Sequence, residues 1–145
     1  MILFSSEIEF EHTNRIKMNK LIIDVANEKI FLMIITNAGI YNITQENTKI
    51  NYEKLSIIIK DFLFSKNLKI AEINEIYINK GPGSFAGIRN SISVVKAFNV
   101  AKNIDYYCYN LDDFKDEKDL SYENIPNLCK KYKIKKNLIN PIYIS

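Results

Sequence analysis

The sequence predicts an α/β protein in which helices pack on a mixed five-stranded sheet. Two observations support this prediction: five short β-rich segments, and two longer segments with helical periodicity among them. Along the chain the order is three strands, a helix, a strand, a helix and a strand. Strand–helix–strand connections are normally parallel crossovers, whereas short turns between the first three strands are typical of an antiparallel meander. The sheet is therefore expected to be mixed.

The five strands are expected where β-branched and aromatic residues cluster between turn residues. They are residues 20–25, 29–36, 40–44, 73–79 and 104–109.

The two helices are expected between the third and fifth strands. In residues 52–66, five apolar side chains share one face at helical spacing; they are Leu55, Ile58, Ile59, Phe62 and Leu63. Ser84 is suited to cap a second helix that reaches about Lys102.

Both ends of the chain differ in pattern from this middle part. Residues 1–17 lack sustained apolar periodicity, and Met18 directly precedes the first strand, so the lobe is expected to comprise residues 18–111. Residues 1–17 are then an extension outside the fold.

Residues 112–145 are expected to begin with an acidic loop. A short helix at 122–132, interrupted early by Pro126, and an extended end at 139–144 are expected to follow.

Composition argues against several classes of protein. The chain has 145 residues, 47% of them hydrophobic and 26% charged, which is ordinary for one globular core. It has no apolar run of about 20 residues and no secretory leader, so a cytosolic protein without a membrane association is expected. Cys108, Cys129 and a single histidine, His12, lack metal-ligand spacing, so no metal site is expected.

Charge is unevenly spread along the chain. A net charge of +3 is small for an autonomous nucleic-acid binder. Five lysines nevertheless cluster near the end, at Lys130, Lys131, Lys133, Lys135 and Lys136. This cluster is either a solvated surface or the basis of a direct RNA-binding module.

A glycine-rich string lies between the fourth strand and the second helix. It reads Gly81-Pro82-Gly83-Ser84-Phe85-Ala86-Gly87-Ile88-Arg89. Glycines at such a turn permit close backbone approach, and a helix start can hold an anion. The spacing matches neither the dinucleotide fingerprint nor a P-loop. A phosphate cradle and a purely structural turn capped by Ser84 therefore both stay open.

As a whole, this string resembles the Gly-Pro-Gly-Ser-Phe-Thr-Gly-Leu-Arg signature of the TsaB (YeaZ) family, with Ala86 and Ile88 as the two differences. The resemblance continues through Ser91, Val94, Lys96 and Ala97 in the following helix, and includes residues 21–24 and the Pro-x-Tyr ending at 141–143. The residues that it marks as the motif loop are Gly81, Pro82, Gly83, Ser84, Phe85, Gly87 and Arg89.

The resemblance implies an actin-like (ASKHA, ribonuclease H-like) fold. Family members are usually much longer and have two related lobes, so this chain is expected to hold one lobe, with residues 112–145 as a shortened remnant of the second. The implied function is that of a non-catalytic scaffold subunit, without a cofactor, in the synthesis of tRNA N6-threonylcarbamoyladenosine.

The implied partners are a TsaD-like catalytic paralogue and a TsaE-like ATPase. Contact with tRNA would be indirect, and a homodimer is a possibility when the protein is alone. The alternative is an independent nucleotide-binding or nucleotide-hydrolysing protein of the same superfamily.

Two charged residues have open roles. Asp24 lies in the first hairpin, where active relatives bind phosphate and magnesium, but Val25, Ala26 and Asn27 follow it in place of hydroxyl residues. Asp24 is therefore either a functional carboxylate or the end of a strand. Arg89 either binds an anion or a partner carboxylate, or pins the loop locally.

Apolar residues outside the expected core suggest a partner surface. They are Ile57 and Phe64 on the first helix, and Val94, Ala97, Phe98 and Ala101 on the second. The resemblance places these helices at a subunit interface. Packing within the chain is the alternative.

Overall fold

The computed structural model of the chain describes residues 18–139 together with 143 and 144. The expectations for residues 1–17 and for residues 140–142 lie outside the described residues. None of the helices in the described part of the chain is long and apolar enough to cross a membrane.

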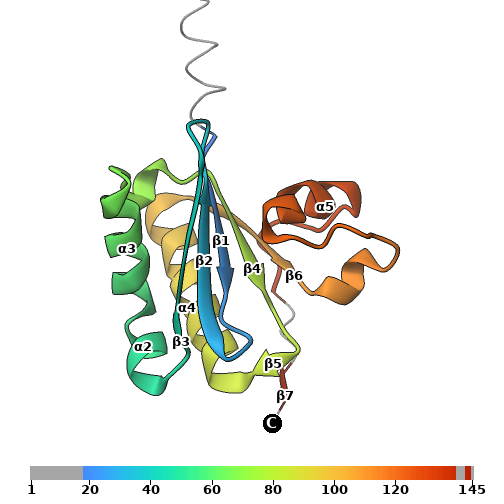
Figure 1. The fold of residues 1–145 in the computed structure, drawn as a ribbon, viewed down its shortest axis with the longest axis horizontal. Helices are drawn as coiled ribbons and strands as arrows, with labels where there is room; N and C mark the ends of the chain where they lie inside the picture. Colours follow the sequence, from blue (N-terminus) through green and yellow to red (C-terminus); the bar gives the residue numbers. More distant parts are fainter. Residues whose placement is uncertain (1–17, 140–142, 145) are drawn as a thin grey trace, which may run out of the picture.

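A mixed five-stranded sheet forms the centre of the protein (Figure 1), with the strand order β3-β2-β1-β4-β6. Its strands are β1 (Lys20–Asp24), β2 (Lys29–Ile35), β3 (Ile40–Glu46), β4 (Glu75–Asn79) and β6 (Asp105–Tyr109). The first three form an antiparallel meander, and β4 and β6 continue the sheet in parallel with β1. The predicted fold class and all five strands are confirmed.

Helices cover both faces of this sheet (Figure 1). One face carries α2 (Lys49–Glu53), α3 (Leu55–Ser65) and α4 (Phe85–Lys102), and the other carries α5 (Ile125–Lys131). Side chains alternate between the two faces along each strand. Thus Leu21 and Ile23 belong to the core under α3 and α4, whereas Ile22 belongs to the core under α5.

The helix predicted at 52–66 corresponds to α3, and the short helix α2, which was not predicted, directly precedes it. Thr48 caps α2 by accepting a hydrogen bond from Asn51 N at 3.3 Å, and Lys54 then leaves the helical conformation with φ −101° and ψ 15°. The Asn51 side chain also donates to the Glu46 carbonyl oxygen at 2.8 Å, which ties α2 to the end of β3. An N-cap bond such as that of Thr48 stabilises the start of a helix.

The segment after residue 111 contains more regular structure than predicted. The acidic stretch starts with a 3₁₀ turn at Leu111–Phe114, and a second such turn at Tyr122–Asn124 leads into α5. Pro126 does not interrupt this helix. It lies in the first turn, where its missing N–H costs no hydrogen bond.

This segment packs on the same sheet as the rest of the chain. Ile125, Leu128 and Phe114 are buried against Ile22 and Tyr109 on the second face. The division of the chain at residue 111 stays a prediction.

A two-stranded parallel pair brings the end of the chain back to the lobe. It joins β5 (Gly83–Ser84) to β7 (Tyr143–Ile144), both at the bottom of Figure 1. The extended end predicted at 139–144 thus forms a strand in its last described residues.

Candidate functional site

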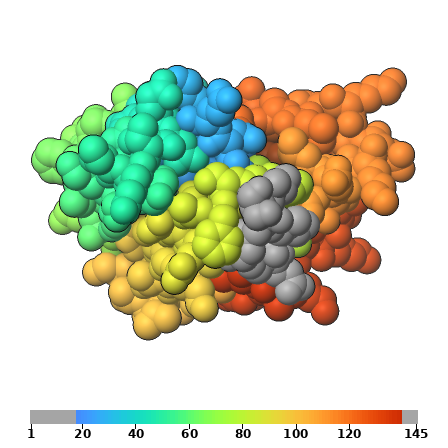
Figure 2. Space-filling view, turned by 90° about the horizontal axis from the view of Figure 1, so that it is seen from below, coloured from blue at the N-terminus to red at the C-terminus, as the bar shows by residue number. Residues whose placement is uncertain are grey.

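The glycine motif packs the start of α4 against the turn between β1 and β2. Figure 2 shows these parts side by side, the turn in blue and the start of α4 in yellow-green. Ser84 Oγ accepts a hydrogen bond from Gly87 N at 3.2 Å and so caps α4 as predicted. Ser84 N donates to the Ala26 carbonyl oxygen at 2.9 Å, which fixes the motif to the turn.

Two motif glycines are required by this close approach. A Cβ atom at Gly83 would lie 2.3 Å from the Ala26 carbonyl oxygen, and one at Gly87 would lie 2.3 Å from the Val25 carbonyl oxygen. Gly81 has a φ of 103°, a conformation that favours glycine. This geometry favours the structural interpretation of the motif.

Asp24 is the centre of a buried polar cluster. Its side chain is only 3% exposed. Oδ1 accepts a hydrogen bond from Ala26 N at 3.1 Å, and Oδ2 accepts from Asn79 Nδ2 at 3.1 Å and from Tyr122 Oη at 2.7 Å. Asn79 Oδ1 in turn accepts from Gly81 N at 2.9 Å. Both carboxylate oxygens are therefore engaged within the protein, which favours the structural interpretation of Asp24.

Tyr122 reaches this cluster from a position 98 residues further along the chain. Its ring stacks on Phe31 with a centroid distance of 3.9 Å and an interplanar angle of 17°. Burial and the neighbouring Asp24 charge raise the pKa of Tyr122 above its usual range. The hydroxyl consequently stays protonated at neutral pH and donates to the carboxylate.

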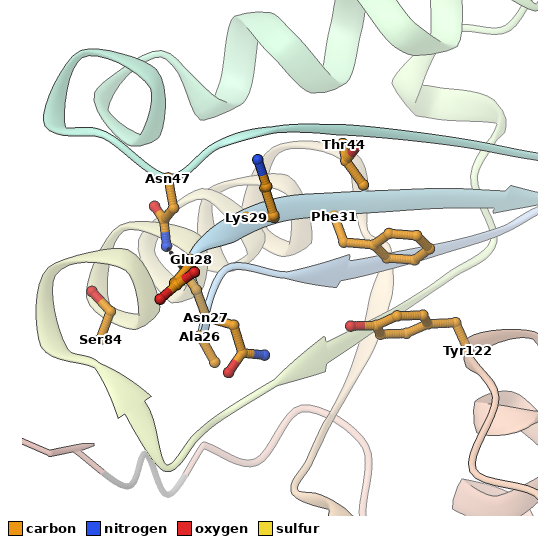
Figure 3. A pocket seen from close by; sticks show the side chains of 9 residues that line it. All are labelled: Ala26, Asn27, Glu28, Lys29, Phe31, Thr44, Asn47, Ser84 and Tyr122. Carbon is orange, nitrogen blue, oxygen red and sulfur yellow. Dashed lines mark hydrogen bonds between the residues drawn. The ribbon is translucent and has the colours of Figure 1, made fainter.

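An open pocket of about 730 Å³ adjoins the cluster (Figure 3). It is lined by Ala26, Asn27, Glu28, Lys29, Phe31, Thr44, Asn47, Ser84 and Tyr122. Asn47 Nδ2 donates to the carbonyl oxygens of Val25 at 3.0 Å and Asn27 at 2.6 Å, while Lys29 pairs with Glu46. The polar side chains around the pocket thus hold the hairpin in place, and they leave room for a small polar molecule.

Arg89 and Phe85 are more exposed than most of the motif. Both side chains are exposed at the start of α4, and the Arg89 guanidinium makes no ion pair or hydrogen bond within the described residues. The two roles considered for Arg89 stay predictions. Pro82, preceded by a cis peptide bond, is also exposed.

The two cysteines are buried and free. Desolvation raises the pKa of each of the Cys108 and Cys129 thiols to about 12. They are therefore poor nucleophiles at neutral pH. Across residues 18–139, His, Cys, Asp and Glu side chains form no cluster of three that could hold a metal ion.

The predicted partner surface lies on the outer side of α3 and α4. Ile57 is 58% exposed and Phe64 is 78% exposed. Ala97 and Ala101 are exposed as well, and Val94 is half-buried against the core.

One residue of that surface needs correction. Phe98 is only 6% exposed and belongs to the core, because the buried line of α4 runs through Ile88, Ile92 and Val95 to Phe98 at helical spacing. Val100, which sequence reasoning passed over, is 85% exposed.

The five-stranded mixed sheet with helices on both faces is the single-lobe α/β architecture that the sequence predicted. YeaZ from Pseudomonas aeruginosa has a similar structure, with a TM-score of 0.60, 18% identity, and coverage of 64% of this chain and 44% of that one. A second structure, described as an uncharacterized protein with similarity to peptidase YEAZ from the same organism, matches with the same TM-score over 64% of this chain and 43% of its own. These likenesses establish the fold.

The sequence comparison points to the same family. Over 87 residues the chain is 25% identical to the tRNA threonylcarbamoyladenosine biosynthesis protein TsaB of Buchnera aphidicola subsp. Schizaphis graminum (strain Sg). The match covers 60% of this chain and 41% of that relative, so the chain spans well under half of its length. No protein-family model matches the chain. The sequence match and the shared fold support the resemblance to the TsaB (YeaZ) family that the glycine motif indicated.

Sequence reasoning missed several residues of the site. Asn79 and Tyr122 carry no motif, and their contact with Asp24 depends on tertiary structure alone. The hairpin side of the pocket was indicated only by Asp24 and the residues that follow it.

Proposed function

We propose that this chain is a non-catalytic partner subunit in the synthesis of threonylcarbamoyladenosine in tRNA. The observation that carries the proposal is the match over 87 residues to a TsaB protein. In this proposal a TsaD-like paralogue performs the chemistry, a TsaE-like ATPase assists, and the protein acts in the cytoplasm.

The bonding of Asp24 supports a non-catalytic role. A carboxylate that is to hold a hydrated magnesium ion needs free oxygen lone pairs on the side of the pocket. Here Tyr122 and Asn79 donate to one oxygen and Ala26 N to the other. Nucleotide chemistry at this carboxylate would first have to displace Tyr122.

The outer side of α3 and α4 is the proposed contact with the TsaD-like partner. Ile57 and Phe64 lie seven residues apart, which places them on one side of α3, two turns from each other. Ala97 and Ala101 on α4 are small enough to let a partner helix approach closely. Large apolar side chains with this exposure favour burial by a second protein.

Reconstitution tests this proposal. Ile57→Asp combined with Phe64→Asp should leave the chain folded and abolish co-purification with the TsaD-like paralogue, because association would bury two unpaired carboxylates. Lys118→Asp, at an exposed polar position away from α3 and α4, is the control. Depletion of the protein in its native organism should also lower tRNA threonylcarbamoyladenosine, measured by mass spectrometry of hydrolysed tRNA. Unchanged modification after depletion, or normal association of the folded double variant, would contradict the proposal.

The second candidate is an independent nucleotide-binding protein, and the pocket beside the hairpin favours it. ATP titration of the isolated chain separates the two candidates. Binding that is weakened by Lys29→Gln and accompanied by hydrolysis would favour this candidate over the scaffold.

A further inference from the structure

We propose that a strip of unpaired lysines on the α5 side of the sheet binds the phosphate backbone of RNA. The strip consists of Lys20, Lys80, Lys130, Lys133 and Lys135. The inference deepens the proposed function and rests on it for the choice of RNA as the polyanion.

Two adjoining pockets bring these lysines together. The first, of about 470 Å³, is lined by Lys20 from β1 and by Lys130 and Lys133 from the end of α5 and beyond. The second, of about 180 Å³, is lined by Lys80, Lys133 and Lys135. Lys133 and Ile134 line both pockets, so the strip is continuous across them.

Two other lysines near the strip form ion pairs with carboxylates. Lys131 pairs with Glu117, and Lys136 lies 3.6 Å from Asp105. Within the part of the chain that the structure describes, none of the five strip lysines forms an ion pair. The strip is thus free to neutralise an external anion.

The acidic side chains beside the strip are engaged in internal hydrogen bonds. Glu75 accepts from the Tyr77 hydroxyl at 2.9 Å and from the Tyr107 hydroxyl at 3.5 Å. Asp113 accepts from Asn110 N at 3.0 Å. Five lysines against these two carboxylates give the strip a formal charge of +3. The strip is therefore positively charged even when its neighbouring carboxylates are counted.

The shape of the strip fits a chain of phosphates better than a single small anion. Its lysines come from separate segments and extend over two pockets, whereas one phosphate needs a single compact cradle. Lysines act as flexible point charges that contact a backbone without reading bases, and Lys130, Lys133 and Lys135 are exposed. We therefore expect weak, salt-dependent and sequence-independent binding, with a dissociation constant of roughly 10⁻⁴ to 10⁻⁶ M at physiological salt.

Fluorescence anisotropy with a labelled, unmodified tRNA transcript tests the inference. If about four phosphates are neutralised, the logarithm of affinity should fall with the logarithm of salt concentration with a slope of about −3. Lys130→Gln combined with Lys133→Gln should reduce this slope by about two and weaken binding at low salt at least tenfold. Lys60→Gln combined with Lys102→Gln, which removes two exposed lysines from α3 and α4, should bind like the parent.

Equal affinity and slope in the two double variants would overturn the inference. Complete displacement of the tRNA by ATP at matched ionic strength would also overturn it, because a small-anion site would then explain the binding. The proposed function is tested by a separate measurement, the level of tRNA threonylcarbamoyladenosine after depletion of the protein. If depletion lowers this level but the two double variants bind tRNA equally, the RNA strip alone is rejected. If RNA binding depends on the strip but depletion leaves the level unchanged, the proposed function alone is rejected.

Discussion

Replacing Gly87 by alanine tests whether the glycine motif acts by close packing. The added Cβ would lie 2.3 Å from the Val25 carbonyl oxygen and 3.0 Å from Val25 Cγ1. Even close carbon–oxygen contacts in proteins are about 3.3 Å. Either α4 or the β1–β2 turn must therefore move by about 1 Å.

Two opposing effects determine how much Gly87→Ala changes the free energy of unfolding. Alanine favours a helix over glycine by up to about 1 kcal/mol, whereas overpacking of a close contact costs about 1–3 kcal/mol and occasionally more. The movement also strains the bonds that Ser84 N and Asn47 Nδ2 make to the Ala26 and Val25 carbonyl oxygens. We expect a net loss of about 2 kcal/mol, which lowers the melting temperature of a chain of this length by about 8 °C.

Urea denaturation measures the effect as a lower midpoint at an unchanged slope. Gly39→Ala is the matched control, because its Cβ would meet only the end of the flexible Tyr41 side chain, at 3.0 Å. It should change the free energy of unfolding by less than about 1 kcal/mol. A neutral or stabilising Gly87→Ala substitution would refute the close approach. A variant of full stability that had lost anion binding would restore the phosphate-cradle interpretation.

Further predictions concern the Asp24 cluster, the tyrosines and the start of the lobe. Tyr122→Phe removes a donor to the buried Asp24 carboxylate and should lower the free energy of unfolding by about 1.5–3 kcal/mol. Tyr132→Phe, which removes a hydrogen bond to Glu117, is the control and should lower it by less than about 1 kcal/mol. Equal decreases in melting temperature for the two variants would contradict this prediction. Burial raises the pKa of Tyr109 well above the usual value near 10, so its contribution to stability is complete below about pH 10 and is lost as pH rises further. Tyrosinate absorbance should therefore show this group ionising together with unfolding, and free titration near pH 10 in the folded protein would count against the prediction. A chain beginning at Met18 should melt at the same temperature as the full chain, and a decrease of more than several degrees would place the preceding residues in the fold.

The sheet and its main helices could be predicted because burial leaves a simple periodic pattern. Residues 20–25 and 29–36 are apolar on both faces, as expected for central strands covered by helices on two sides. Helix α2 and the break at Lys54 were not predicted, because the apolar residues that mark the longer helix begin only at Leu55. The start of α2 depends on side-chain bonds of Thr48 and Asn51, which apolar periodicity does not record.

The site was only partly predictable for a similar reason. The glycine string marked the loop, since glycine is the one residue that fits against the Val25 and Ala26 carbonyl oxygens. On α4, however, nearly every side of the helix carries apolar residues, so sequence spacing could not decide between Phe98 and Val100 as the exposed residue. The packing of α4 against the core decides it, and that is a tertiary property.

The segment that carries Tyr122 also closes the second face of the sheet, and the two roles are linked. Leu128 and Ile125 pack under α5 against Ile22 and Tyr109, while Tyr122, one short turn before α5, stacks on Phe31 and donates to Asp24. Because the 3₁₀ turn at Tyr122–Asn124 runs directly into α5, the position of the tyrosine ring depends on the packing of that helix. Loosening α5 would therefore do more than weaken a core. It would withdraw the hydroxyl from Asp24 and leave a buried carboxylate with one donor fewer beside the pocket, so the apolar contacts of α5 on the same face of the sheet help to set the polarity of the pocket.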